Sequence, residues 1–150
     1  MSSHHLAQIN VGRLRAPADS PEVAEFMAAL DPINALADAS EGFVWRFQTE
    51  DGNATAVRPY GDELIIINFS TWVSTEALAD YVYRSAHTAF LRRRREWFER
   101  MDDVAVAMWW VPAGHRPSVD EAVGRLELLR RDGPGPDAFT FRVRHSPDGR

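Results

Sequence analysis

Strand-like and helix-like segments follow one another along this chain in an order that few folds accommodate. Four segments have the apolar or alternating patterns of strands: 5–11, 42–48, 64–69 and 104–111. Apolar residues at helical spacing follow the first of these over 20–36 and the third over 74–98. This β-α-β-β-α-β order predicts a ferredoxin-like α+β fold, in which the crossover helices cover one face of the sheet.

Capping signals set where the expected helices begin and end. Three serines precede helical segments as N-caps: Ser20, Ser74 and Ser118. Asp31-Pro32 repeats the cap-then-proline signal, so we expect the first helix to break there and restart, and Ser85 to mark a bend in the second. A further helix ends at Gly133, and alternation over 139–143 predicts a short closing strand. The fold therefore gains an extra C-terminal helix and strand.

The length and composition fit one domain. With 150 residues, 45% of them hydrophobic and 26% charged, the chain can bury one core but not two. We expect residues 1–150 to form a single domain, ordered over about 5–143, with a polar tail from His145 onward. The strands carry more large apolar groups than a monomer can hide: Trp45, Ile66, Met108 and Trp110. We therefore expect a homodimer that packs through the sheet face.

Missing residue types exclude several kinds of site. The chain has no cysteine and no lysine, and all 17 basic residues are arginines. Disulfides, thiolate metal sites, P-loops and Schiff bases are therefore excluded. A net charge of −5 argues against nucleic acid as a partner. No apolar run reaches the roughly 18 residues of a membrane span, and the first residues lack a secretory pattern, so we expect a cytoplasmic protein.

Several motifs resemble those of one uncharacterised bacterial family. They are Ala7-Gln8-Ile9-Asn10, Gly42-Phe43-Val44-Trp45-Arg46, Ser85-Ala86-His87 and Trp109-Trp110-Val111-Pro112. That family is a domain of unknown function in the dimeric α/β-barrel superfamily, beside the antibiotic-biosynthesis monooxygenases. The resemblance covers nearly the whole chain and implies a dimeric α/β barrel, but the family carries no established reaction.

The superfamily includes cofactor-free monooxygenases that oxidise anthrone-type aromatic polyketides. Such members have an Asn and a Trp near the end of the third strand, together with a Tyr. Asn68 and Trp72 resemble that pair in type and position. The Tyr expected just after them is absent, and Tyr81 and Tyr83 occur further along instead.

Haem-degrading members of the same superfamily use an Asn on the first strand, a Trp after the third strand and a His on the second helix. Asn10, Trp72 and His87 occupy comparable elements. The spacing from Trp72 to His87 is longer here, so the correspondence is loose. The resemblance therefore implies no resident cofactor, with haem as the alternative.

Each polar candidate has a structural and a functional interpretation. His87, which we expect in mid-helix, could act as a general base or haem ligand, or hydrogen-bond the backbone as a core histidine. Asn68 interrupts an apolar strand, so its amide could polarise a substrate oxygen or fix the end of the strand. Asn10 invites the same two interpretations, with structure favoured because its strand is expected near an edge.

The aromatic and cationic candidates are open in the same way. Trp45 and Trp72 could line a pocket for a flat ligand, or pack in the core or at an interface. Tyr83 and Arg94 are expected within reach of the His87 face and are the further candidate substrate contacts. The arginine run 92–95 reads either as a solvated face or as an anion-binding patch.

Two functions follow from these residues. The first is a cofactor-independent, monooxygenase-like enzyme for a small flat aromatic substrate, with Asn68 polarising the substrate oxygen, Trp72 and Trp45 shaping the pocket and His87 serving as base. The second is a non-catalytic module that binds a small hydrophobic or haem-like ligand, or only its own copy. No metal-binding motif such as His-Glu-x-x-His occurs. The enzyme requires Asn68, Trp72 and His87 to converge on one cavity.

Overall fold

The computed structural model describes residues 3–48, 59–85, 87–101 and 103–147. Within them, one antiparallel sheet contains β1 (His4–Arg13), β2 (Phe43–Arg46), β3 (Ile65–Trp72) and β4 (Val106–Pro112). The helices are α1 (Ala24–Asp38), preceded by the 3-10 turn Pro21–Val23, then α2 (Thr75–Arg84), α3 (His87–Arg92), α4 (Arg94–Trp97) and α5 (Val119–Asp132). No helix in the described ranges is long and apolar enough to cross a membrane.

The order of the strands defines the topology. Across the sheet they run β2-β3-β1-β4, and each neighbouring pair is antiparallel. The connection from β1 to β2 through α1 skips β3, and the connection from β3 to β4 through α2, α3 and α4 skips β1. This is the ferredoxin-like α+β arrangement, so the fold class predicted from the sequence is confirmed.

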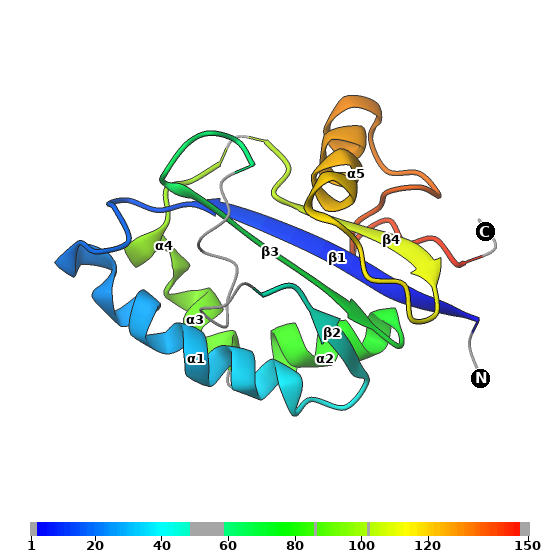
Figure 1. Ribbon diagram of the computed structural model, residues 1–150, viewed down its shortest axis with the longest axis horizontal. Helices are drawn as coiled ribbons and strands as arrows, with labels where there is room; N and C mark the ends of the chain where they lie inside the picture. The colour runs from blue at the N-terminus through cyan, green and yellow to red at the C-terminus, as the bar shows by residue number, and fades with distance from the viewer. Residues whose placement is uncertain (1–2, 49–58, 86, 102, 148–150) are drawn as a thin grey trace.

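The sheet has a helical layer on each face. Figure 1 shows α1 to α4 on one side and α5 alone on the other. Leu126 and Leu129 of α5 pack against Ile9 of β1 and Trp109 of β4 in one buried cluster. On the opposite face, Leu78 of α2 belongs to a second cluster with Trp72, and Trp97 of α4 to a third with Ile66.

Burial within one chain changes the reasoning behind the expected dimer. Ile66 and Met108 are buried within one chain, while Trp45 and Trp110 are partly buried. The expectation that a monomer could not hide this set is therefore wrong for two of its four members. The reason is that Ile66 packs with Trp97 of α4, and Met108 packs with Trp72 and with Leu78 of α2, on the sheet face opposite α5.

The first helix is continuous where a break was expected. α1 runs from Ala24 to Asp38 with Pro32 inside it. Ser20 does cap the preceding 3-10 turn, as expected, by accepting a hydrogen bond from the Glu22 N–H. Pro32 is exposed, on the solvent side of the helix, where the loss of one N–H donor is tolerated. Packing of the inner face, including Ala37, outweighs the local signal.

The second helical stretch divides into α2, α3 and α4. Ser74 caps α2 through the Ala77 N–H, and Ser85 is extended where α2 ends, so the expected cap and bend are confirmed. The division moves His87 from mid-helix, where it was expected, to the first residue of α3. The Ser85 hydroxyl donates to the Tyr81 carbonyl oxygen and accepts from the His87 N–H, which stabilises this break.

The C-terminal part follows the expectation only up to α5. Ser118 caps α5 through the Glu121 N–H, but the closing strand is reduced to one bridge between Met108 and Phe139. The chain turns immediately afterwards, where the Thr140 hydroxyl accepts from the Val143 N–H. The expected tail begins as packed structure, because the Trp110 indole N–H donates to the His145 carbonyl oxygen at 2.7 Å.

Truncating Leu126 tests whether α5 completes the core. Leu126 is fully buried between α5 and the sheet, so Leu126→Ala should lower the free energy of unfolding by about 2–5 kcal/mol, measured by urea denaturation. Leu128→Ala, on a half-buried position of the same helix, should cost less. Equal losses in the two variants would contradict this packing of α5.

Candidate functional site

A large cavity lies between the sheet and the helices α1 to α4. Its volume is about 1250 Å³, and both layers contribute to its lining. Most of the candidates from the sequence line it: Asn10, Asn68, Trp72, Tyr83, His87 and Arg94. Asn68, Trp72 and His87 therefore line the same cavity, which the enzyme hypothesis requires.

Polar side chains from two central strands form the floor of this cavity. In the β1–β3 register, Asn10 lies opposite Asn68, and Gln8 lies opposite Ser70. The Gln8 amide N–H₂ donates to Ser70 Oγ at 2.8 Å and to Asn68 Oδ1 at 3.1 Å. The Asn10 amide N–H₂ donates to Gln8 Oε1 at 3.0 Å. These four residues are named the polar floor below.

The polar floor fixes the orientation of the Asn68 amide. Its Oδ1 accepts from Gln8 and also from the Asn10 N–H₂, at 3.3 Å. The Nδ2 group carries two N–H donors, and no described residue accepts a hydrogen bond from it. Because Asn68 lines the cavity, this donor pair is available to a ligand.

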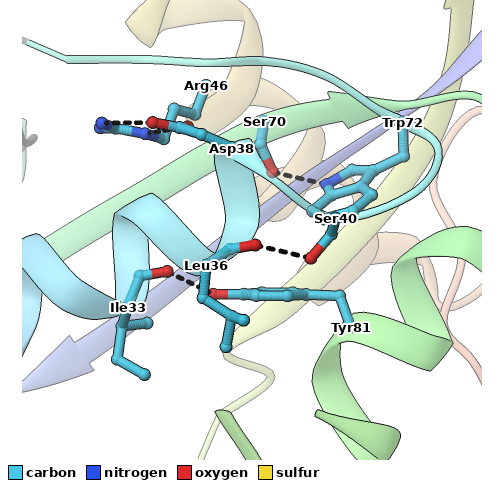
Figure 2. A network of polar contacts seen from close by, with 8 residues as sticks. All are labelled: Ile33, Leu36, Asp38, Ser40, Arg46, Ser70, Trp72 and Tyr81. Atoms are coloured by element: carbon cyan, nitrogen blue, oxygen red, sulfur yellow. Dashed lines mark hydrogen bonds and ion pairs between the residues drawn. The ribbon is translucent and has the colours of Figure 1, made fainter. Parts of the chain in front are cut away.

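Two aromatic side chains form a wall beside the polar floor. The Trp72 indole N–H donates to Ser70 Oγ at 2.9 Å, which joins the wall to the floor (Figure 2). Tyr81 stacks on Trp72 with ring centroids 5.2 Å apart, and its hydroxyl donates to the Ile33 carbonyl oxygen. Burial raises the pKa of Tyr81 to about 12, so this phenol stays protonated at neutral pH.

His87 extends the same wall. Its ring lies 4.9 Å from the Tyr81 ring, and its Nδ1 lies 3.3 Å from the Val82 carbonyl oxygen. A contact with a carbonyl favours the tautomer that is protonated at Nδ1, which leaves the lone pair of Nε2 as an acceptor. Burial lowers the pKa of His87 below its ordinary 6.5, so the ring is neutral at pH 7.

Charged groups lie around these neutral ones. Arg46 of β2 lines the cavity, its side chain is only 11% exposed, and it pairs with Asp38 of α1 (Figure 2). The Arg46 Nε–H donates to one Asp38 carboxylate oxygen at 2.8 Å and an Nη2–H to the other at 3.3 Å. Arg94 of α4 lines the cavity from an exposed position.

Two candidates occupy different places from those expected. The pairing of β2 with β3 shifts register between Phe43 and Trp45. As a result, Trp45 lies opposite Thr71 and packs against Phe69 on the α5 face of the sheet. It does not line the cavity and is not part of this site. Tyr83 is 54% exposed and packs against Phe141, so it belongs to the rim.

Sequence reasoning missed Gln8 and Ser70, and it noted Tyr81 only as a tyrosine further along the chain than the one expected. A signal for Gln8 was present, because alternation over 5–11 places it on the same face as Asn10. Ser70 could be found only from the register between β1 and β3, and Tyr81 only from the packing of α2. Among the described residues, no group of three His, Asp or Glu side chains could hold a metal ion.

Comparisons with known structures give distant similarities. A protein from Pseudomonas aeruginosa, PA3566, has 16% identity and a TM-score of 0.49, over 79% of this chain and 98% of its own. SnoaB, a cofactor-independent oxygenase from Streptomyces nogalater, has 13% identity and a TM-score of 0.49, over 79% and 98%. A putative antibiotic biosynthesis monooxygenase from Nitrosomonas europaea has 12% identity and a TM-score of 0.49, over the same shares.

A family comparison covers more of the chain. No curated protein matches it. The model of one family, described as Domain of unknown function (DUF3291), matches residues 5–150. Because this match spans nearly the whole sequence, the protein belongs to the DUF3291 family.

Proposed function

We propose that this protein is a cofactor-independent, monooxygenase-like enzyme that binds a small flat aromatic substrate in the cavity. One observation carries the proposal: a free amide donor, a neutral imidazole and an aromatic wall line the same space. They are contributed by Asn68, by His87 and by Trp72 with Tyr81. The cavity volume of about 1250 Å³ is ample for a fused-ring ligand.

The proposed chemistry begins with proton transfer. An anthrone-type substrate has an acidic C–H group conjugated through its rings to a carbonyl. Nε2 of His87 removes this proton, and the electron pair moves onto the carbonyl oxygen as a phenolate-like oxyanion. The Nδ2–H groups of Asn68 donate to that oxygen. The electron-rich ring then reacts with O₂, so that anthrone and O₂ give anthraquinone and water.

The polar floor supports this role because it holds the donor in place before the charge develops. Gln8 and Asn10 both donate to the oxygen of Asn68, so its N–H₂ does not need to reorient when the oxyanion forms. Donors fixed in advance and shielded from water contribute more to catalysis than donors that must rotate. Ser70 ties the same floor to Trp72 and thereby holds the wall.

Replacing the donor or the base should remove oxidation of anthrone, followed by O₂ consumption. Asn68→Asp keeps an oxygen that accepts from Gln8 and Asn10 but loses the donor pair, so kcat/KM should fall by about 100-fold or more. His87→Gln loses the base and should also cost at least about 100-fold.

Thr71→Val is the matched control for these variants. Thr71 is buried on the opposite face of the same strand, and its hydroxyl has no partner within the described part of the chain. The change should leave kcat/KM unaltered. Anthrone oxidation that is absent, or equal in the wild type and in folded Asn68→Asp, would contradict the enzyme and favour a binding module.

The pH dependence should show His87 acting in its neutral form. Burial lowers the pKa of His87 below 6.5, so the imidazole is a neutral, active base at every pH above that lowered pKa. We expect kcat/KM, corrected for spontaneous oxidation, to be level above about pH 7 and to fall only on acidification through that lower pKa. A fall in kcat/KM with a midpoint above pH 6.5 would exclude His87 as the base. The same fall in the His87→Gln variant would also exclude it.

Haem binding at His87 is the second candidate. It is favoured by the contact between Nδ1 of His87 and the Val82 carbonyl oxygen, the kind of hydrogen bond that orients metal-binding histidines. The neutral Nε2 would be the iron ligand. A saturable Soret shift on hemin titration, abolished by His87→Ala, would replace the oxygenase with this function.

We also propose that the protein is a homodimer. Its cytoplasmic location remains a prediction from the sequence. The support is Trp45, which lies half-buried on edge strand β2. Trp45 lies on the same sheet face as α5, and α5 covers this face above β1 and β4. A second copy would cover the β2 side and complete an α/β barrel.

Light scattering tests this assembly. We expect a mass twice the 17.0 kDa of one chain, because a second copy would bury the half-exposed Trp45. Trp45→Glu should shift the mass to that of one chain, since a carboxylate at the proposed interface would lose its water without gaining a partner. A wild-type protein with the mass of one chain would overturn the dimer.

A further inference from the structure

Arginines gather around the cavity from three stretches of the chain: β2, residues 92–100 and the C-terminal segment. Arg46, described above, comes from β2. The others come from α3, from α4 with the residues after it, and from the C-terminal segment: Arg92, Arg94, Arg95, Arg100 and Arg142. All five of these are exposed, so they lie where the cavity opens to solvent. They are named the arginine rim below.

The arginine rim has few negative charges to balance it. Glu99 is the one carboxylate among the described residues that line the cavity, and it pairs with Arg13, which is not part of the lining. None of the rim arginines forms an ion pair with a described carboxylate. The described part of the mouth therefore carries a net positive charge.

This charge distribution contrasts with that of the rest of the chain. The net charge is −5, so carboxylates outnumber arginines. Several arginines elsewhere do pair with carboxylates: Arg93, within the same run as the rim, pairs with Glu25 and Glu96, and Arg131 pairs with Asp132. In an acidic protein, five of the nine described arginines without a described carboxylate partner thus line one cavity, and the other four are Arg15, Arg116, Arg125 and Arg144.

We propose that the cavity selects an aromatic ligand that carries an anionic group, such as a carboxylate. The ring lies over the polar floor and along the wall of Trp72 and Tyr81, while the anion meets guanidinium groups of the arginine rim. Guanidinium forks suit carboxylates, and a cleft of one charge sign raises the local concentration of an oppositely charged ligand. This inference deepens the proposed function, because it names the class of substrate for the same cavity.

The probes for this test are a matched pair of dyes. 8-Anilinonaphthalene-1-sulfonate carries a sulfonate, and N-phenyl-1-naphthylamine has the same ring system without it. Both change fluorescence on leaving water. We expect the wild-type protein to bind the anionic dye more tightly than the neutral one, with a preference that weakens between about 0.02 M and about 0.5 M ionic strength.

Variants locate the preference. Arg94→Gln/Arg95→Gln should bind the anionic dye about tenfold more weakly and change the affinity for the neutral dye by less than about twofold. The control is Arg84→Gln/Arg131→Gln, which removes the same charge from positions that are 81% and 70% exposed and do not line the cavity. This variant should keep the preference.

Three results would overturn the inference. Equal affinity for both dyes in the wild type would mean that the arginine rim does not select, although the cavity would still bind aromatic molecules as the proposed function requires. An equal loss in the control variant would mean that only the overall charge matters. Failure of both dyes to bind would remove both the inference and the proposed ligand cavity.

Discussion

The rest of the structure depends on the register between the two central strands. Pairing Gln8 with Ser70, and Asn10 with Asn68, gathers four polar side chains on one face of the sheet. The same register sends Ile9 and its neighbours to the other face, against α5. A slip of one residue would place the amides in the apolar core and expose the core residues to the cavity. The core and the polar floor are thus two consequences of one pairing.

The two helical layers pack against the sheet in different ways. α5 packs closely over β1 and β4 and buries the apolar face, whereas α1 to α4 meet the opposite face at its ends and leave a cavity between. A row of amides in a sheet is costly unless its groups are hydrogen-bonded. Here Gln8, Asn10 and Ser70 bond to one another or to Asn68, and the donors of Asn68 are left over. These unused donors are the reason for the proposal that Asn68 binds a ligand.

Local signals predicted what is local in this fold. The capping hydroxyl of Ser118 and the order of strands and helices follow from short sequence patterns, and they are confirmed. Asn68 could be singled out because it interrupts an apolar strand. Trp45 could not be placed, since an irregularity in β2 shifts its alternation to the other face. The break predicted at Pro32 was wrong because tertiary packing of α1 outweighed the local preference of the proline. The position of Tyr81 beside Trp72 could not be predicted from the sequence, because it depends on how α2 packs against the sheet.

The central claim is that the amide of Asn68 meets a flat anionic ligand. The most direct measurement is an NMR titration of the side-chain Asn and Gln amides with anthraquinone-2-carboxylate, with the Asn68 signals assigned by their loss in Asn68→Asp. The account predicts that the Nδ2 signals of Asn68 shift saturably and more than those of Gln48, an exposed amide outside the cavity. Asn68 signals that do not move while the ligand binds elsewhere would contradict it.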